Sequence, residues 1–340
     1  MPTRLLAALS TAVLLLVLPG CGADEPGGGD GLVVYSGRNE NLVQPLFDRF
    51  TEQTGIEVTP RYGDSASLAA ALLEEGDSTR ASVFLSQDAG ALGALQDVDR
   101  LAPLDQALLD RVPAAYRSRE GDWVGVSGRS RVLVYNEDLV DPAELPDSVL
   151  DLVEPRFRGK VGYAPPNASW QAFVTGLRVV QGEQAARTFL EGFKANEPRA
   201  FDGNVAVLDA VEAGDVPFGL VNHYYLYEKT AATEGGLEAL HAVNHLFAPG
   251  DPGALVNVAG VGVLQGRADD RTRQLVDFLL GTEAQTYFAE ETKEFPLVAG
   301  VAPDVPGLPP LAELQGPDVD LSELDSLQQT LALLEEVGLT

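Results

Sequence analysis

Cysteine is almost absent from this sequence. Cys21 is the only one, so a disulfide within the chain is impossible. Histidine is scarce as well: there are three, and none of them lies in an HExxH pattern. The chain also lacks a GxSxG motif and a phosphate-binding loop of the GxxxxGK type. These absences argue against a metalloprotease, a serine hydrolase and a phosphate-loop nucleotide enzyme, and we expect a protein that is not an enzyme.

Basic residues are few. The 23 Lys and Arg face 51 Asp and Glu, and the formal net charge is −28. Nucleic-acid binding needs a basic surface to neutralise phosphates, so nucleic acid is excluded as a partner. A hydrophobic content of 45% is ordinary for a globular protein. The 340 residues are enough for two domains of ~100–200 residues each.

Long apolar runs are confined to the N-terminus. Arg4 precedes the apolar segment LLAALSTAVLLLVL, which is too short to span a membrane comfortably and ends in LPGCG. This pattern resembles a bacterial lipoprotein signal, which implies cleavage before Cys21 and a lipid on its thiol. An ordinary secretory signal with an incidental cysteine is the alternative. We predict a signal peptide over residues 1–20, a flexible glycine-rich tether over 21–31, and an extracytoplasmic protein anchored to the membrane by lipid.

The rest of the chain alternates between strand-like and helix-like patterns. LVVYS reads as a buried strand, and NLVQPLFDRFTEQTG has apolar residues at helical spacing, with Gly55 where a C-terminal cap belongs. IEVTPRY, SLAAALLEEG and SVFLSQ continue the alternation. This order is typical of a parallel α/β sheet, in which ligands bind beyond the carboxyl ends of the strands.

Two adjacent phenols stand out in the segment GLVNHYYLYEKT. The preceding run, VPFGLVN, reads as a buried strand, and the residues after Tyr224 and Tyr225 have helical composition. Neighbouring side chains diverge by ~100° inside a regular helix. We therefore expect Tyr224 to come from the end of the strand and Tyr225 from the first turn of the helix, where irregular backbone lets both rings converge.

Several motifs in one order resemble a known family. VYSGRNE, VGVSGRSRVLVYN, FRGKVGY, LVNHYYLYE and DPGALVNVAG are similar to the ferric-ion-binding branch of bacterial ABC-transporter substrate-binding proteins, the bacterial counterparts of transferrin. The resemblance implies an α/β, two-lobe periplasmic-binding-protein fold of type II, with hinge-linked, discontinuous lobes and a ligand cleft between them. We predict lobe one over 32–127 plus 256–300, and lobe two over 128–255 plus 301–340.

The same resemblance implies a function. It predicts a monomer that captures Fe³⁺ through Tyr224 and Tyr225 and delivers it to a membrane ABC permease. Phenolate oxygen suits Fe³⁺, because this small, hard cation prefers anionic oxygen ligands. The family's further histidine and glutamate ligands align with Asn39 and Gln87, neither of which is anionic. Glu40 and Asp88 lie one residue further on and are substitutes; otherwise exogenous anion and water complete the site.

Members of the family often hold carbonate or phosphate beside the metal as a synergistic anion. The positions that the resemblance assigns to the anion are Arg129, Arg131, Asn167, Ala168, Ser169, Asn204 and Asn222, with Arg38 as a further donor. Plain helix capping by Asn204, or ion pairing by one of the arginines, is the alternative for these residues. The alternative function is a protein of the same fold that binds a small organic or anionic ligand, such as a thiamine-like compound or a sugar acid.

Overall fold

The computed structural model describes residues 31–301 and 305–340. The predicted signal peptide, Cys21 and the tether up to residue 30 lie outside the described residues. No helix in the described part is long and apolar enough to cross a membrane.

The N-terminal part of the chain builds an α/β sheet. Its strands β1 and β2 are parallel, as are β1 and β3, whereas β10 runs antiparallel to β3. The strands are β1 (Leu32–Ser36), β2 (Val58–Tyr62), β3 (Val83–Ser86), β4 (Leu101–Ala102), β10 (Val256–Leu264) and β11 (Phe295–Pro296). The helices associated with them are α1 (Glu40–Thr54), α2 (Ser65–Glu75), α3 (Ala89–Gln96), α4 (Gln106–Leu109), α9 (Asp270–Leu279) and α10 (Thr282–Glu290). The predicted strand–helix alternation is confirmed here.

Helix α1 shows how the sequence sets these elements. The Asn39 side chain accepts a hydrogen bond from the Asn41 N–H at the start of the helix, and Gly55 ends it in the left-handed conformation, with φ of 73°. Phe47 and Phe50 lie three residues apart, so both point into the core. Gly55 is thus confirmed as the predicted cap.

A second sheet follows in the middle of the chain. Its strands are β6 (Val161–Tyr163), β7 (Arg199–Ala200), β8 (Phe218–Asn222) and β9 (Ala242–His245). Its helices are α5 (Ala168–Gln181), α6 (Glu183–Ala195), α7 (Asn204–Glu212) and α8 (Tyr224–Ala232). Strand β6 is parallel to both β7 and β8. Trp170, Phe189 and Phe193 belong to an aromatic-rich core of this part, with the last two rings stacked at 5.9 Å.

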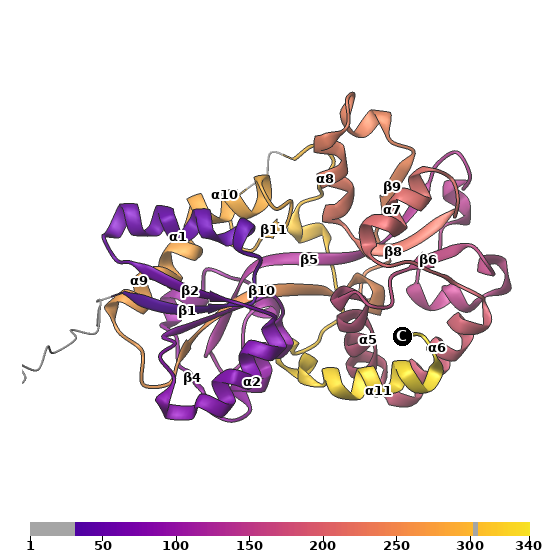
Figure 1. Cartoon of the computed structure of the whole chain (residues 1–340). Helices are drawn as coiled ribbons and strands as arrows, with labels where there is room; N and C mark the ends of the chain where they lie inside the picture. The colour runs from indigo at the N-terminus through magenta and orange to yellow at the C-terminus, as the bar shows by residue number, and fades with distance from the viewer. Residues whose placement is uncertain (1–30, 302–304) are drawn as a thin grey trace, which may run out of the picture. The chain divides into compact units, whose positions relative to one another are not determined.

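One long strand, β5 (Trp123–Asn136), belongs to both sheets (Figure 1). Its first part pairs with β10, from Trp123 opposite Gly262 to Ser130 opposite Val256. Its second part, from Arg131 onward, pairs with β8 and β9. The sequence pattern indicated only RVLVYN as a strand, whereas all 14 residues of β5 are extended and buried. The change of sheet falls at residues 130–131, inside the SGRSR motif.

The C-terminal segment also contacts both parts. A 3₁₀ turn at Leu321–Asp325 packs on α3, while α11 (Leu327–Val337) packs on α5 and α6 (Figure 1). The contact with α3 is close because α3 offers glycines there. A Cβ on Gly93 would lie 2.0 Å from the Ser322 carbonyl oxygen, and one on Gly90 would lie 2.2 Å from that of Leu324.

We predict that Gly93→Ala destabilises the protein although alanine is the better helix former. The added methyl would have to displace backbone, so we expect a loss of about 1–3 kcal/mol in the free energy of unfolding. Urea unfolding would measure this loss. Gly192→Ala in α6 is the matched control, because its Cβ would meet only side-chain carbons of Val153, at 3.0 Å. An equal loss in both variants would contradict the close-packing explanation.

Candidate functional site

The tyrosine pair stands at the junction of β8 and α8. Strand β8 ends at Asn222 and α8 begins at Tyr224, so both Tyr224 and Tyr225 lie in the first turn of the helix. The prediction that Tyr224 belongs to the strand end is therefore wrong. The rings nevertheless lie together, with centroids 4.3 Å apart and planes inclined by 33°. His223 already has helical backbone angles, φ −56° and ψ −38°, so the helical path starts one residue before α8.

Burial controls the ionisation of Tyr224. Removal from water raises the pKa of Tyr224, the neighbouring Tyr225 raises it further, and the charge of Arg129 opposes both effects. Without a metal ion beside it, the Tyr224 phenol thus keeps its proton at neutral pH. A cation that binds here must displace that proton.

Arg131 is the positive charge that faces the pair. Its side chain is buried, and its guanidinium donates to Ser169 Oγ at 2.9 Å, to the Leu220 carbonyl at 2.9 Å and to Asn222 Oδ1 at 3.3 Å. Burial lowers the pKa of Arg131 to about 10, while Tyr225 and Tyr224 oppose that shift. Arg131 therefore stays protonated at neutral pH, and its Nε finds no hydrogen-bond partner within the described residues.

Polar groups from two helix starts gather on Ser169. Asn167 caps α5, accepting from the Ser169 N–H at 2.9 Å and from its hydroxyl at 2.6 Å. Ala168 is the first residue of that helix. Asn204 begins α7 but does not cap it; its amide donates to Ser169 Oγ at 2.9 Å, and its buried Oδ1 lacks a partner in the part of the chain described. The structure thus links the predicted residues Arg131, Asn167, Ser169, Asn204 and Asn222.

The other two arginines converge on a carboxylate that the sequence did not reveal. Glu294 receives Arg38 through two hydrogen bonds, of 2.9 and 3.0 Å. Ser127 Oγ donates to the same carboxylate at 2.5 Å, and Arg129 Nη1 lies 3.7 Å from it. Burial raises the pKa of Glu294, but Arg38 and Arg129 more than offset this effect, so the net pKa lies below the ordinary value.

His223 has a structural role, because both nitrogens of its ring are hydrogen-bonded to backbone groups. Its Nδ1 accepts from the Ser130 N–H at 3.2 Å, so Nε2 carries the proton and donates to the Lys293 carbonyl at 3.0 Å. The ring stacks on Phe295 with centroids 4.1 Å apart. His223 thereby ties the residue before the tyrosine pair to the segment that carries Glu294.

The positions that align with the family's histidine and glutamate have other contacts. Asn39 caps α1 and is exposed, as is Glu40 next to it. Gln87 accepts from Arg38 at 2.8 Å, and Asp88 caps α3. No cluster of three His, Cys, Asp or Glu side chains suited to a metal occurs in residues 31–301 and 305–340. A metal held here would therefore depend on the phenols rather than on a cluster of carboxylates and imidazoles.

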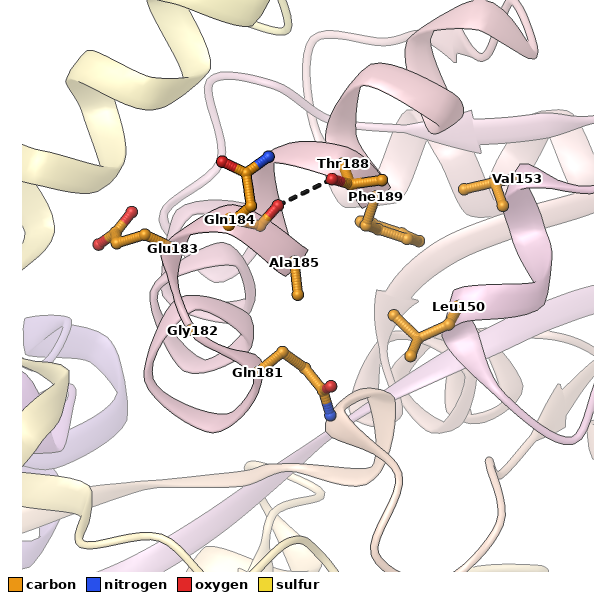
Figure 2. Close-up of a pocket in the computed structure, with 9 residues that line it drawn as sticks. All are labelled: Leu150, Val153, Gln181, Gly182, Glu183, Gln184, Ala185, Thr188 and Phe189. Carbon is orange, nitrogen blue, oxygen red and sulfur yellow. Dashed lines mark hydrogen bonds between the residues drawn. The ribbon is translucent and has the colours of Figure 1, made fainter.

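A hollow of about 780 Å³ lies elsewhere, beside the turn between α5 and α6 (Figure 2). It is lined largely by apolar and amide side chains: Leu150, Val153, Gln181, Gly182, Glu183, Gln184, Ala185, Thr188 and Phe189. It shares no residue with the tyrosine pair or with the arginine cluster, and its lining offers a metal few anionic oxygens. The chemistry of the site therefore centres on α8 and β5.

Comparison with known proteins identifies the family of the chain. Residues 78–321 match the family of bacterial extracellular solute-binding proteins. The chain belongs to this family. This solute-binding protein is 35% identical over 320 residues to the Fe(3+)-binding periplasmic protein of Serratia marcescens, covering 94% of this chain and 93% of that relative.

Two solved structures resemble it along most of their length. Iron-bound HitA from Pseudomonas aeruginosa has a TM-score of 0.80 and 31% identity, with 91% of this chain and 100% of that chain covered. The Trichodesmium protein IdiA (FutA), in complex with iron and citrate ligands, has a TM-score of 0.76 and 28% identity, with the same coverage. The predicted α/β, two-lobe type II fold is confirmed by these neighbours, and the prediction of a non-enzyme by the iron-binding transport proteins among the relatives.

We predict that His223 makes the stability of the metal-free protein depend on pH. Burial lowers the pKa of His223 from 6.5 to about 4, so the unfolded state binds a proton first as the pH falls. This contribution is fully present above pH 6.5 and is lost as the pH falls towards 4. The loss amounts to about 3 kcal/mol.

The variant His223→Gln isolates this effect, because it lacks the titrating ring. Urea unfolding of parent and variant at a series of pH values should show the extra slope in the parent alone. Parallel pH curves would contradict the assignment of a buried neutral imidazole.

Proposed function

We propose that this solute-binding protein captures Fe³⁺ outside the cytoplasm, with Tyr224 and Tyr225 as adjacent phenolate ligands, and delivers it to an ABC permease. The observation that carries the proposal is a pair of half-buried tyrosines beside the buried Arg131, with their ring centroids 4.3 Å apart. A trivalent cation supplies the field that removes their protons, and it prefers the anionic oxygens that result. The relatives named for ferric iron support this assignment.

A small anion completes the proposed site. Two phenolates leave one positive charge of Fe³⁺ uncompensated, and carbonate or phosphate would neutralise it. Arg131 Nε and Arg129 Nη1 have no hydrogen-bond partner in the described part of the chain, and both are buried donors suited to an anion. The start of α5, with Asn167, Ala168 and Ser169, adds backbone N–H groups and the positive end of a helix dipole. Asn204 and Asn222 complete the polar wall.

Asn39, Glu40 and Gln87 remain the protein's proposed additional contacts to iron. Gln87 and Asn39 offer only neutral amide oxygens, and Gln87 already accepts from Arg38. Glu40 is the anionic candidate, exposed in the first turn of α1. We propose further that the protein is a monomer and that the lobes, 32–127 plus 256–300 and 128–255 plus 301–340, close over the ligand about the strands that connect them.

Tyrosine-to-phenylalanine variants test the metal site. Tyr224→Phe or Tyr225→Phe removes one oxygen and keeps the ring, so the visible phenolate-to-iron colour and most of the Fe³⁺ affinity should be lost while the fold remains. Absorption spectra during titration with ferric citrate, and competition with a chelator, would measure both. Tyr227→Phe is the control, because the Tyr227 hydroxyl donates to the Gly307 carbonyl at 2.7 Å.

Tyr227→Phe should keep the colour and the affinity. If both pair variants bind Fe³⁺ as tightly as the parent, or if the parent never colours, the proposed metal site is wrong. A colourless parent that binds a small organic anion would favour the alternative function.

The proposed anchor is a lipid on Cys21 after removal of residues 1–20. Cys21→Ser removes the thiol that would carry the lipid, so the protein should leave the membrane fraction or retain its signal peptide. Fractionation and the mass of the processed chain would measure this. Unchanged membrane association and processing would contradict the lipid anchor, while leaving the metal site untouched.

A further inference from the structure

Glu294 has an unusual position for a carboxylate. Its side chain is 4% exposed, yet it lies among the arginines next to the tyrosine pair. Both of its oxygens are engaged, one by Arg38 Nη1 and the other by Arg38 Nη2 and Ser127 Oγ. It is therefore not a free metal ligand. Its carboxylate lies 3.7 Å from Arg129 Nη1, and the neighbouring Lys293 carbonyl accepts a hydrogen bond from His223, the residue before the tyrosine pair, at 3.0 Å.

The two arginines around Glu294 are neutralised to different degrees. Arg38 is 1% exposed and is held by a bidentate pair, the strong geometry for guanidinium and carboxylate. Arg129 Nη2 donates to the Gln87 carbonyl, but its Nη1 lies 3.7 Å from Glu294 and has no hydrogen-bond partner among the described residues. Among the described residues each arginine therefore keeps one unpartnered buried nitrogen, and the two differ in how closely Glu294 approaches them, 2.9 Å for Arg38 and 3.7 Å for Arg129.

We propose that Glu294 is a built-in counter-anion of the cleft, which occupies Arg38, offsets part of the charge of Arg129, and so limits how tightly the iron-free cleft holds an anion from solvent. This inference rests on the proposed function, in that the cleft binds an anion together with iron. The exogenous anion is then held tightly only when Fe³⁺ adds its own charge. Glu294 is in this sense a positioning and specificity residue: it makes anion binding depend on the metal.

Other carboxylates do not fill this role in the same way. The charge of Arg129 also favours the ionised form of Asp88. The Asp88 carboxylate, however, caps α3 and accepts a hydrogen bond from the Ala91 N–H. Glu228 is exposed on α8, so water and salt screen its charge. Glu294 is held by two arginines and a serine, and burial makes its charge act over a longer range than a solvated one.

Single and double substitutions change the net charge of the cluster while they keep side chains of similar size. Glu294→Gln makes the cluster one unit more positive, Arg38→Met makes it one unit less positive, and the double variant returns it to the parent charge. The probe is inorganic phosphate at neutral pH and low chloride, titrated calorimetrically into protein stripped of iron with a chelator. We expect Glu294→Gln to bind phosphate about tenfold more tightly than the parent, Arg38→Met more weakly, and the double variant like the parent.

A matched control removes the same charge elsewhere. Arg178 and Glu183 form an ion pair between α5 and α6, outside the arginine cluster of the cleft. Glu183→Gln therefore changes the net charge as Glu294→Gln does and should leave phosphate binding unchanged. Equal tightening in both Gln variants would show a general charge effect and overturn the inference.

Two further outcomes would also overturn it. One is phosphate binding by Glu294→Gln that is no tighter than in the parent; the other is a double variant that keeps the full gain of the single one. If Glu294→Gln fails to fold because two buried cations are left unpaired, Arg38→Met decides, and undiminished phosphate binding in that variant sinks the idea. All these measurements use iron-free protein, so a failure here is distinct from a parent that never colours with ferric citrate.

Discussion

The antiparallel pairing of β5 with β10 is the constraint on which the rest of the molecule depends. This ladder runs from Trp123 opposite Gly262 to Ser130 opposite Val256, and β5 then continues directly into the second sheet. Because the strand is continuous, the residues at the change of sheet cannot move far from either part. Ser127, Arg129 and Arg131 all lie there, next to the start of α8 through the bond between Ser130 and His223. The polar centre is therefore built on a stretch of backbone that pairs with strands of both sheets.

Local signals in the sequence predicted much of this architecture. Gly55 ends α1 as expected, and the first strands alternate with helices as the sequence pattern predicts. These features depend on a few neighbouring residues, so propensity and periodicity are enough to find them. The start of α8 was misjudged by one residue, because His223 adopts helical angles while its ring is held by Ser130 and Lys293. That hold is a tertiary contact, which no local pattern contains.

Glu294 shows the limit of such prediction more sharply. Its partner Arg38 is 256 residues away in the chain, and KEFP has no periodic pattern that would indicate a buried carboxylate. The arginines are expected from family motifs, yet the motifs do not separate Arg38, which Glu294 holds in a bidentate pair, from Arg131, which donates to a hydroxyl, an amide oxygen and a backbone carbonyl. Only the structure distinguishes the two arginines, because the partner of each guanidinium depends on which elements the fold brings together.

The packing of the C-terminal segment has a consequence for the order in which the protein folds. Leu321 and Leu324 belong to the core of the N-terminal sheet, and Leu334 and Val337 belong to the core of the second. Both cores thus need residues that lie about 200 positions or more after the first strands. Contacts between such distant residues form late and slowly, because a long loop must close first. The nascent chain therefore cannot complete either core before residues 321–337 have been made, even though its first strands emerge early.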